Sequence, residues 1–93
     1  MHIAIHNWMR AEPVEKTLAR IASQGYDALE IEGSPEKYDT KYIRGLLKSH
    51  GLRCWGSVTL MLEQRNLLAK DEGQRAASVQ YVKDVITMVK ELE

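Results

Sequence analysis

A repeated junction constrains the fold of this chain more than any other feature. Gln24-Gly25 and His50-Gly51 each end a helical stretch, and each is followed at once by a strand-like segment. Glycine adopts the left-handed backbone that ends a helix at little cost. The two glycines are 26 positions apart (51 minus 25). This spacing is typical of one strand–helix unit, so the sequence predicts a repeating βα architecture.

Three short segments have the apolar alternation or β-branched content of strands: residues 2–6, 28–32 and 52 to about 59. In the second, Leu29 and Ile31 alternate with Glu30 and Glu32, which places the two carboxylates on the other face of the strand. Gly56 interrupts the third strand and predicts either a β-bulge or a close backbone approach. We therefore expect three strands, of which the middle one carries charge on one face.

Three helices are predicted to follow the strands: residues 13–24, 40–50 and about 73–92. Pro13 suits the first turn of a helix, and either Asp39 or Thr40 can cap the second. Gly45 costs that second helix about 1 kcal/mol relative to alanine, so we expect something to pack closely against it. Several apolar residues recur at helical spacing and predict buried faces: Tyr42, Ile43, Leu46 and Leu47 in the second helix, and Ala76, Val79, Val82, Val85, Ile86, Val89 and Leu92 in the third.

The resulting order β-α-β-α-β-α predicts an α/β fold of three βα units, with parallel strands joined by right-handed crossovers. Residues 1–93 are expected to form a single domain. The chain stops at Glu93, where a further strand is expected, so we interpret it as part of a longer architecture.

Composition excludes several classes of protein. Thirteen basic and 13 acidic residues cancel, which does not suit a nucleic-acid binder. No apolar run approaches the roughly 20 residues that span a membrane. Cys54 is the single cysteine and cannot form an internal disulfide, so a cytoplasmic location is expected and Cys54 is interpreted as a small core residue.

The chain also resembles a known family through five motifs taken in order: Ile3-Ala4-Ile5-His6-Asn7-Trp8, Gly25-Tyr26-Asp27-Ala28-Leu29-Glu30-Ile31, His50-Gly51-Leu52, Arg65-Asn66-Leu67, and Arg75-Ala76 with Tyr81-Val82-Lys83. Together they are similar to the start of the xylose isomerase-like sugar phosphate isomerase/epimerase family. The resemblance implies a (β/α)8 TIM barrel of about 250 residues when complete. This chain would then supply the first three of its eight units.

The resemblance also implies an activity for the complete protein. Members of this family are metal-dependent isomerases or epimerases of sugars, sugar phosphates or polyols. They hold a divalent metal (Mn, Mg, Co or Zn) on Glu, Asp, His and Glu residues of later strands. Because those strands are absent here, we expect no catalytic residue, metal ligand or cofactor in this segment, and no activity from it alone.

Site residues are expected where the barrel type places its active site, at the carboxyl ends of the strands. The substrate-binding candidates are His6, Trp8, Glu32, Glu63, Arg65 and Asn66. His6 could bind a sugar hydroxyl or be satisfied by a neighbour, and Trp8 could form a wall against a sugar ring or simply pack the loop. Glu32 is the better candidate of the carboxylate pair, whereas Glu30 is expected to pair with a basic residue.

The loop candidates also have two interpretations. Arg65 and Asn66 could contact a phosphate or carboxylate, since arginine gives bidentate recognition. They could equally anchor the loop through backbone hydrogen bonds, which is the interpretation that we favour.

Two alternatives to the enzyme interpretation remain open. A three-stranded parallel sheet has two unpaired edges, so the chain could be a non-catalytic fragment that associates with itself through them. It could also be a small flavodoxin-like domain that binds a phosphorylated ligand, although no glycine-rich loop follows the first strand.

Overall fold

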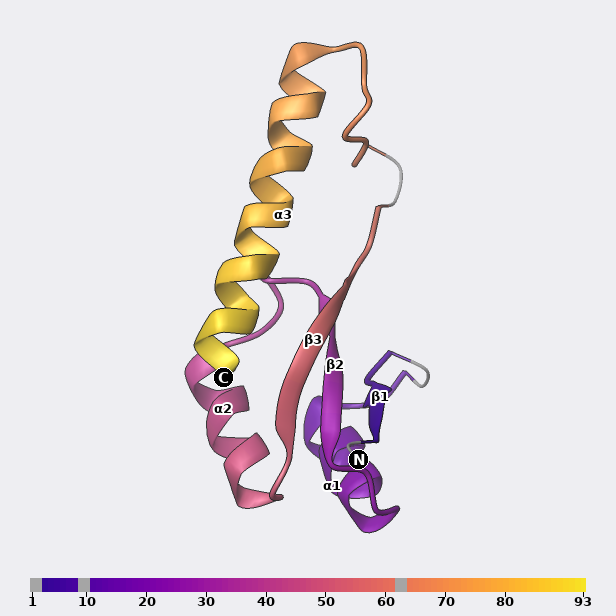
Figure 1. The fold of residues 1–93 in the computed structure, drawn as a ribbon, viewed down its shortest axis with the longest axis vertical. Coiled ribbons are helices and arrows are strands. Elements are labelled where there is room, and N and C mark those ends of the chain that lie inside the picture. The colour runs from indigo at the N-terminus through magenta and orange to yellow at the C-terminus, as the bar shows by residue number, and fades with distance from the viewer. Residues whose placement is uncertain (1–2, 9–10, 62–63) are drawn as a thin grey trace.

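The computed structural model describes residues 3–8, 11–61 and 64–93. Its elements are β1 (Ala4–His6), α1 (Val14–Ser23), β2 (Ala28–Gly33), α2 (Thr40–Ser49), β3 (Arg53–Thr59) and α3 (Glu72–Leu92) (Figure 1). The strands form one parallel sheet in the order β1-β2-β3. The predicted α/β fold of three βα units with parallel strands is therefore confirmed.

The helices share one core on a single face of the sheet. Leu29 and Ile31 of β2 are completely buried, and they belong to one cluster with residues of all three helices. In Figure 1, α2 and α3 lie beside β3, and α1 lies behind β2. Because side chains alternate along a strand, His6, Glu30 and Glu32 project from the other face of the sheet.

Both junction glycines have the backbone that the sequence predicts. Gly25 has φ +86° and Gly51 has φ +67°, in the left-handed region. Each glycine follows the C-cap residue of a helix, and a strand begins a few residues later. The repeat in the sequence is therefore a repeat of the same helix-to-strand turn.

The cap of α2 is Asp39, which was one of the two predicted candidates. Its Oδ1 accepts hydrogen bonds from the backbone N–H groups of Lys41 and Tyr42, at 3.1 and 3.4 Å. Thr40 instead donates its hydroxyl to Glu91 of α3 at 2.6 Å. Thr40 thus links two helices rather than capping one.

Two predictions about the packing of α2 are wrong. A Cβ added to Gly45 would meet nothing within 4 Å, so no group packs closely there. Tyr42 is 50% exposed, whereas Ile43 and Leu47 are buried as predicted. Its long side chain reaches out of the helix, and its hydroxyl donates to Glu15 of α1 at 2.9 Å.

The buried face of α3 agrees only in part with the predicted stripe, of which Val85 and Leu92 are buried. The residues buried along this helix are Ser78, Tyr81, Val85, Met88 and Leu92. Val79 and Ile86 are 40% and 62% exposed. The face of α3 that packs against the sheet and α2 includes the polar side chains of Ser78 and Tyr81. Val79 and Ile86 are not fully covered by other described residues.

The bulge suggested by Gly56 is present in β3. Leu29 pairs with Cys54, but Glu30 pairs with Gly56, so Trp55 is the extra residue. No atom lies within 4 Å of a Cβ added to Gly56, which excludes the alternative of a close approach. Cys54 packs against the core, and burial raises the pKa of its thiol, as expected of a core residue rather than a nucleophile.

Candidate functional site

The carboxyl end of β2 is held from the β1 side by the side chain of Asn7. The ladder between the two strands ends where the Asn7 N–H donates to the Glu30 carbonyl at 3.2 Å. Beyond that point, the Glu32 N–H donates to Oδ1 of Asn7 at 2.7 Å. A side chain thus takes the place that the next residues of a longer β1 would occupy, and it fixes the backbone of Glu32.

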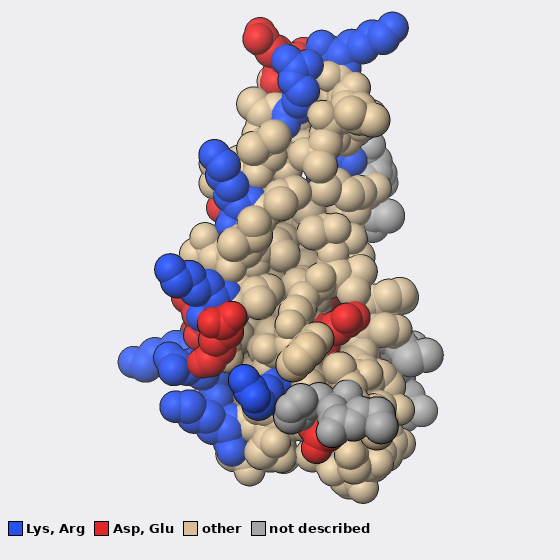
Figure 2. All heavy atoms as spheres, viewed as in Figure 1, with Lys and Arg blue, Asp and Glu red and all other residues tan. Residues whose placement is uncertain are grey.

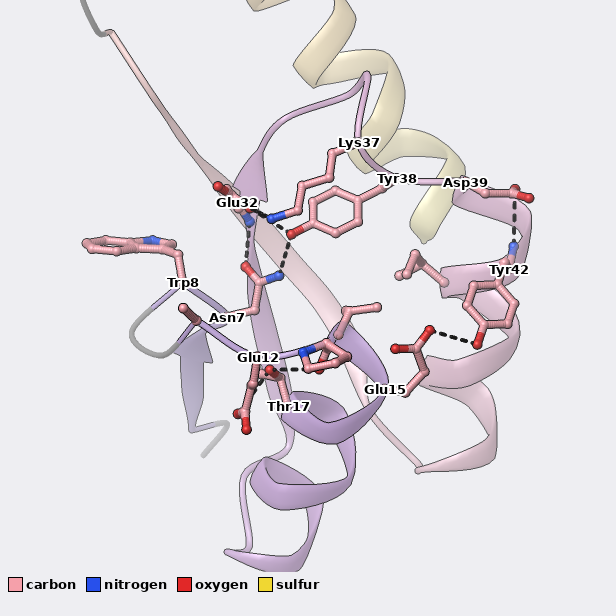
Figure 3. A pocket seen from close by; sticks show the side chains of 14 residues that line it. Asn7, Trp8, Glu12, Glu15, Thr17, Glu32, Lys37, Tyr38, Asp39 and Tyr42 are labelled. Carbon is pink, nitrogen blue, oxygen red and sulfur yellow. Dashed lines mark hydrogen bonds and ion pairs between the residues drawn. The ribbon is translucent and has the colours of Figure 1, made fainter.

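The carboxylate of Glu32 is the centre of a hydrogen-bonded network (Figure 3). Its Oε2 accepts hydrogen bonds from Lys37 Nζ at 2.9 Å and from the Tyr38 hydroxyl at 2.8 Å. Asn7 Nδ2 donates to the same hydroxyl at 2.9 Å. One asparagine therefore orients both the backbone of Glu32 and the tyrosine that binds its side chain.

This network fixes the protonation of its members. Burial by itself raises the pKa of Glu32, but hydrogen bonds from Lys37 and Tyr38 and the charge of Lys37 outweigh it, and the pKa lies below its ordinary value. The pKa of Tyr38 is raised by burial and by its hydrogen bond to Glu32. At neutral pH, Glu32 is therefore an anion and Tyr38 a neutral donor.

An aromatic surface adjoins the carboxylate. Trp8 stacks on His6 with ring centroids 4.1 Å apart and an interplanar angle of 16°. Trp8 nevertheless remains 48% exposed. His6 Nδ1 is buried and has no hydrogen-bond partner among the described residues. His6 thus supports the tryptophan from beneath, and Trp8 presents an apolar surface to solvent.

Trp8 and Glu32 line a groove that lies between the first turns of α1 and α2 and has a cavity volume of about 620 Å³ (Figure 3). The charged residues that line it are Glu12, Glu15, Glu32, Lys37 and Asp39. Glu32 is paired with Lys37 and Glu12 is paired with Arg20 at 2.7 Å, so Glu15 and Asp39 are the lining carboxylates that have no ion pair among the described residues. Such a groove disfavours anionic ligands.

The loop candidates do not line this groove. Arg65 donates to the Leu60 carbonyl at 2.9 Å, and its guanidinium lies 3.8 Å from the centre of the Tyr81 ring. The Asn66 N–H donates to the Ser78 hydroxyl at 2.8 Å. Both residues anchor the loop, as the favoured interpretation holds. The remaining candidate, Glu63, lies outside the described residues.

The sequence did not predict three residues of the network, and the ion pair that it predicted for Glu30 is not observed among the described residues. Asn7, Lys37 and Tyr38 were not singled out, although Asn7 directly follows the first strand and the other two follow the turn after β2. Glu30 was expected to pair with a basic residue, but it has no ion pair within residues 3–8, 11–61 and 64–93. Local sequence does not show which loop side chains fold back onto a strand end.

The described part of the chain offers no site for the implied divalent metal. It contains no group of three or more His, Cys, Asp and Glu residues placed to hold a metal ion. The carboxylate of Glu32 is engaged by Lys37 and Tyr38 instead.

In the part of the chain that the structure describes, no helix has the length and apolar character needed to cross a membrane.

Comparison with known proteins identifies the fold. No family model and no curated protein sequence matches the chain. The crystal structure of D-psicose 3-epimerase with D-tagatose, from Clostridium cellulolyticum H10, superposes with a TM-score of 0.78 at 19% sequence identity. The match covers 99% of this chain and 34% of that chain. The chain thus spans about a third of the length of the epimerase and has the fold of a partial TIM barrel, as expected.

Proposed function

We propose that this chain is the N-terminal segment of a sugar isomerase or epimerase of the xylose isomerase-like family, and that its groove contacts a neutral sugar. The observation that carries the proposal is the anionic Glu32, held beside the exposed Trp8 at the carboxyl ends of parallel strands. Barrels of this kind build their active sites at that end of the strands.

The two side chains suit complementary parts of a sugar. A carboxylate has two oxygens with about four acceptor positions, and Lys37 and Tyr38 share one of these oxygens. Glu32 therefore retains capacity to accept a hydrogen bond from a sugar hydroxyl. Trp8 offers its apolar ring to the C–H face of the sugar, an arrangement that suits an aromatic residue with a polar edge.

The charge of the groove supports a neutral sugar over a sugar phosphate. Glu15 and Asp39, which have no ion pair among the described residues, would repel a phosphate group. Because the described residues offer no metal site, the role proposed for this segment is substrate contact. The metal and the acid–base groups of the reaction belong to the rest of the barrel, so we expect no activity from the 93-residue chain alone.

Fluorescence of Trp8 tests this proposal. In a Trp55→Phe background, Trp8 is the one remaining tryptophan. D-tagatose should change its emission saturably, with a Kd in the millimolar range. Glu32→Gln keeps an acceptor oxygen but removes the charge, so it should weaken binding by about 5- to 12-fold, because hydrogen bonds to charged groups exceed neutral ones by roughly 1–1.5 kcal/mol.

The control is Glu36→Gln, a glutamate of the next turn that does not line the groove. It should bind as the parent does. The proposal would be wrong if the emission of Trp8 did not respond, or if Glu32→Gln and Glu36→Gln bound D-tagatose equally.

A second function, association of the chain with a copy of itself, is favoured by the uncovered surface of α3 and β3. Ile86 and Trp55 are 62% and 61% exposed, and β3 pairs with β2 alone among the described strands. Figure 2 shows one face of the molecule, on which Lys and Arg side chains gather along the left margin and at the top, while the middle carries few charged side chains. The net charge of zero gives little repulsion between copies.

A further inference from the structure

The hydroxyl of Tyr81 occupies a position between β2 and β3 where a backbone hydrogen bond is expected. The Asp27 carbonyl accepts from the Arg53 N–H at 3.2 Å, so alternate residues of β2 direct their carbonyls toward β3, and Gly33 is one of them. Gly33 pairs with Thr59 in the register. A continued parallel ladder would therefore place the Leu60 N–H on the Gly33 carbonyl.

The structure has an inserted hydroxyl instead of that bond. The Leu60 N–H donates to the Tyr81 hydroxyl oxygen at 2.8 Å, and this hydroxyl donates to the Gly33 carbonyl at 2.6 Å. We propose that Tyr81 is a positioning residue, which wedges the ends of β2 and β3 apart and so sets where the site at the end of β2 lies.

The surroundings of Tyr81 hold the wedge in place. The residue is 8% exposed, and the guanidinium of Arg65 lies over its ring while donating to the Leu60 carbonyl. A Cβ on Gly33 would lie 2.8 Å from the Tyr81 hydroxyl and 2.5 Å from the Val58 carbonyl. A side chain at position 33 and a hydroxyl at this point therefore exclude each other.

The wedge acts on Glu32 through the backbone. Glu32 directly precedes Gly33, and its own N–H is held from the opposite side by Asn7 at 2.7 Å. Asn7 thus holds the peptide group that precedes Glu32, and Tyr81 holds the carbonyl of Gly33, one peptide group beyond the one that follows Glu32. The importance of this clamp for ligand binding rests on the proposed function, but its geometry does not.

Nuclear magnetic resonance of the 93-residue chain tests the wedge directly. In the parent chain, the Leu60 amide should exchange slowly, yet show no scalar coupling across a hydrogen bond to the carbonyl carbon of Gly33. In Tyr81→Phe the strands should close, so that this coupling appears while the Leu60 amide stays protected. The titration midpoint of Glu32 should shift in the same variant, which a purely structural role for the ring would not cause.

Tyr26→Phe is the control, because it removes the hydroxyl of a tyrosine that precedes the start of β2 and does not line the groove. It should change neither the Leu60 amide nor the Glu32 titration. Slow exchange at Ile31 reports that a variant is folded. If folded Tyr81→Phe showed a fast-exchanging Leu60 amide and no coupling, the wedge would be refuted, because the strands would have failed to close.

If Tyr81→Phe does not fold, the coupling between Leu60 and Gly33 in the parent chain still tests the wedge. A direct coupling between Leu60 and Gly33 in the parent would overturn the proposal, and its absence at a protected amide would support it. Sugar binding is a separate readout. If D-tagatose fails to bind the parent chain, the proposed function fails, and the coupling result still decides the wedge.

Discussion

Glu32 keeps its charge because its neighbours donate to it. Lys37 and Tyr38 bind one carboxylate oxygen at 2.9 and 2.8 Å, and the side chain of Glu32 is 19% exposed. Burial opposes ionisation, but the donors and the positive charge outweigh it, so the pKa is lowered. The hydrogen bond to Glu32 in turn raises the pKa of Lys37. The pair is thus charged across the neutral range.

These shifts predict how stability depends on pH. The contribution of Glu32 is present above about pH 4.3, the ordinary glutamate pKa, and is lost as the pH falls through its lower folded pKa. The contribution of Lys37 is present below the ordinary lysine pKa of about 10.4 and is lost as the pH rises through its higher folded pKa.

Replacing Lys37 with methionine should reveal the acid limb. Because Lys37 is 60% exposed, the variant should lose only about 0.5 kcal/mol of unfolding free energy at pH 7. The loss should be smaller at a pH below the lowered pKa of Glu32, where the carboxylate is protonated and the pairing is lost. Urea unfolding at both values measures it, and Lys41→Met in α2 is the control. A loss that is equal at the two pH values would contradict the assigned pairing.

Gly33 and Gly45 should respond to alanine in opposite directions. A Cβ at Gly33 meets the Val58 carbonyl at 2.5 Å, so Gly33→Ala should destabilise the chain by about 1–3 kcal/mol. A Cβ at Gly45 meets nothing within 4 Å, so Gly45→Ala should stabilise it by up to about 1 kcal/mol. Thermal unfolding of both variants provides the comparison, and equal effects would contradict the packing described here.

Position along the chain predicted part of the site, but not its partners. Trp8 and Glu32 could be selected because each follows or ends a predicted strand. The network around them depends on which loop side chains fold back, and Asn7 and Tyr38 do so through contacts 25 and 31 positions apart in sequence. Periodicity carries no information on such contacts. Arg65 could also be selected by its position after a strand, but it lies outside the groove because its guanidinium contacts the Tyr81 ring and the Leu60 carbonyl.

At the level of elements, local signals located the helices and strands but not every buried face. The two left-handed glycines and the N-cap at Asp39 depend on the backbone of neighbouring residues alone, so the sequence is enough to predict them. Ser78 is 1% exposed on α3, which apolar periodicity could not predict. Its hydroxyl is satisfied by the Gln74 carbonyl and the Asn66 N–H, both at 2.8 Å. A polar residue with such partners is buried at little cost.

The cap of α2 offers a test at this scale. Asp39→Ala should cost about 1 kcal/mol of unfolding free energy, because it removes the acceptor for the first N–H groups of the helix. Asp39→Asn should restore most of the loss, since asparagine caps helices comparably. Chemical unfolding measures both variants. Equal losses in the two would show that the charge of Asp39, rather than its capping bond, stabilises α2.

At the level of the whole molecule, the uncovered side of α3 and β3 is the main unexplained surface. A groove there, of about 330 Å³, is lined by apolar residues of α3 that include Val82, Ile86 and Val89. If the chain associates with a copy of itself through this surface, Ile86→Lys should lower the average mass seen in sedimentation equilibrium at high concentration. Lys83→Ala, on the same helix, is the control. A parent chain that stays monomeric at millimolar concentration would contradict self-association.

The fold and the proposed function meet at the carboxyl ends of β1 and β2, and mapping a bound sugar there tests their connection most directly. Amide chemical shifts of the labelled chain, recorded while D-tagatose is added, report where the sugar binds. Saturable changes are expected at Asn7, Trp8, Glu32 and Tyr38, and none at Trp55 or along α3. Changes centred on Trp55 or α3, or no change at sugar concentrations far above the millimolar range, would contradict a sugar site at the ends of these strands.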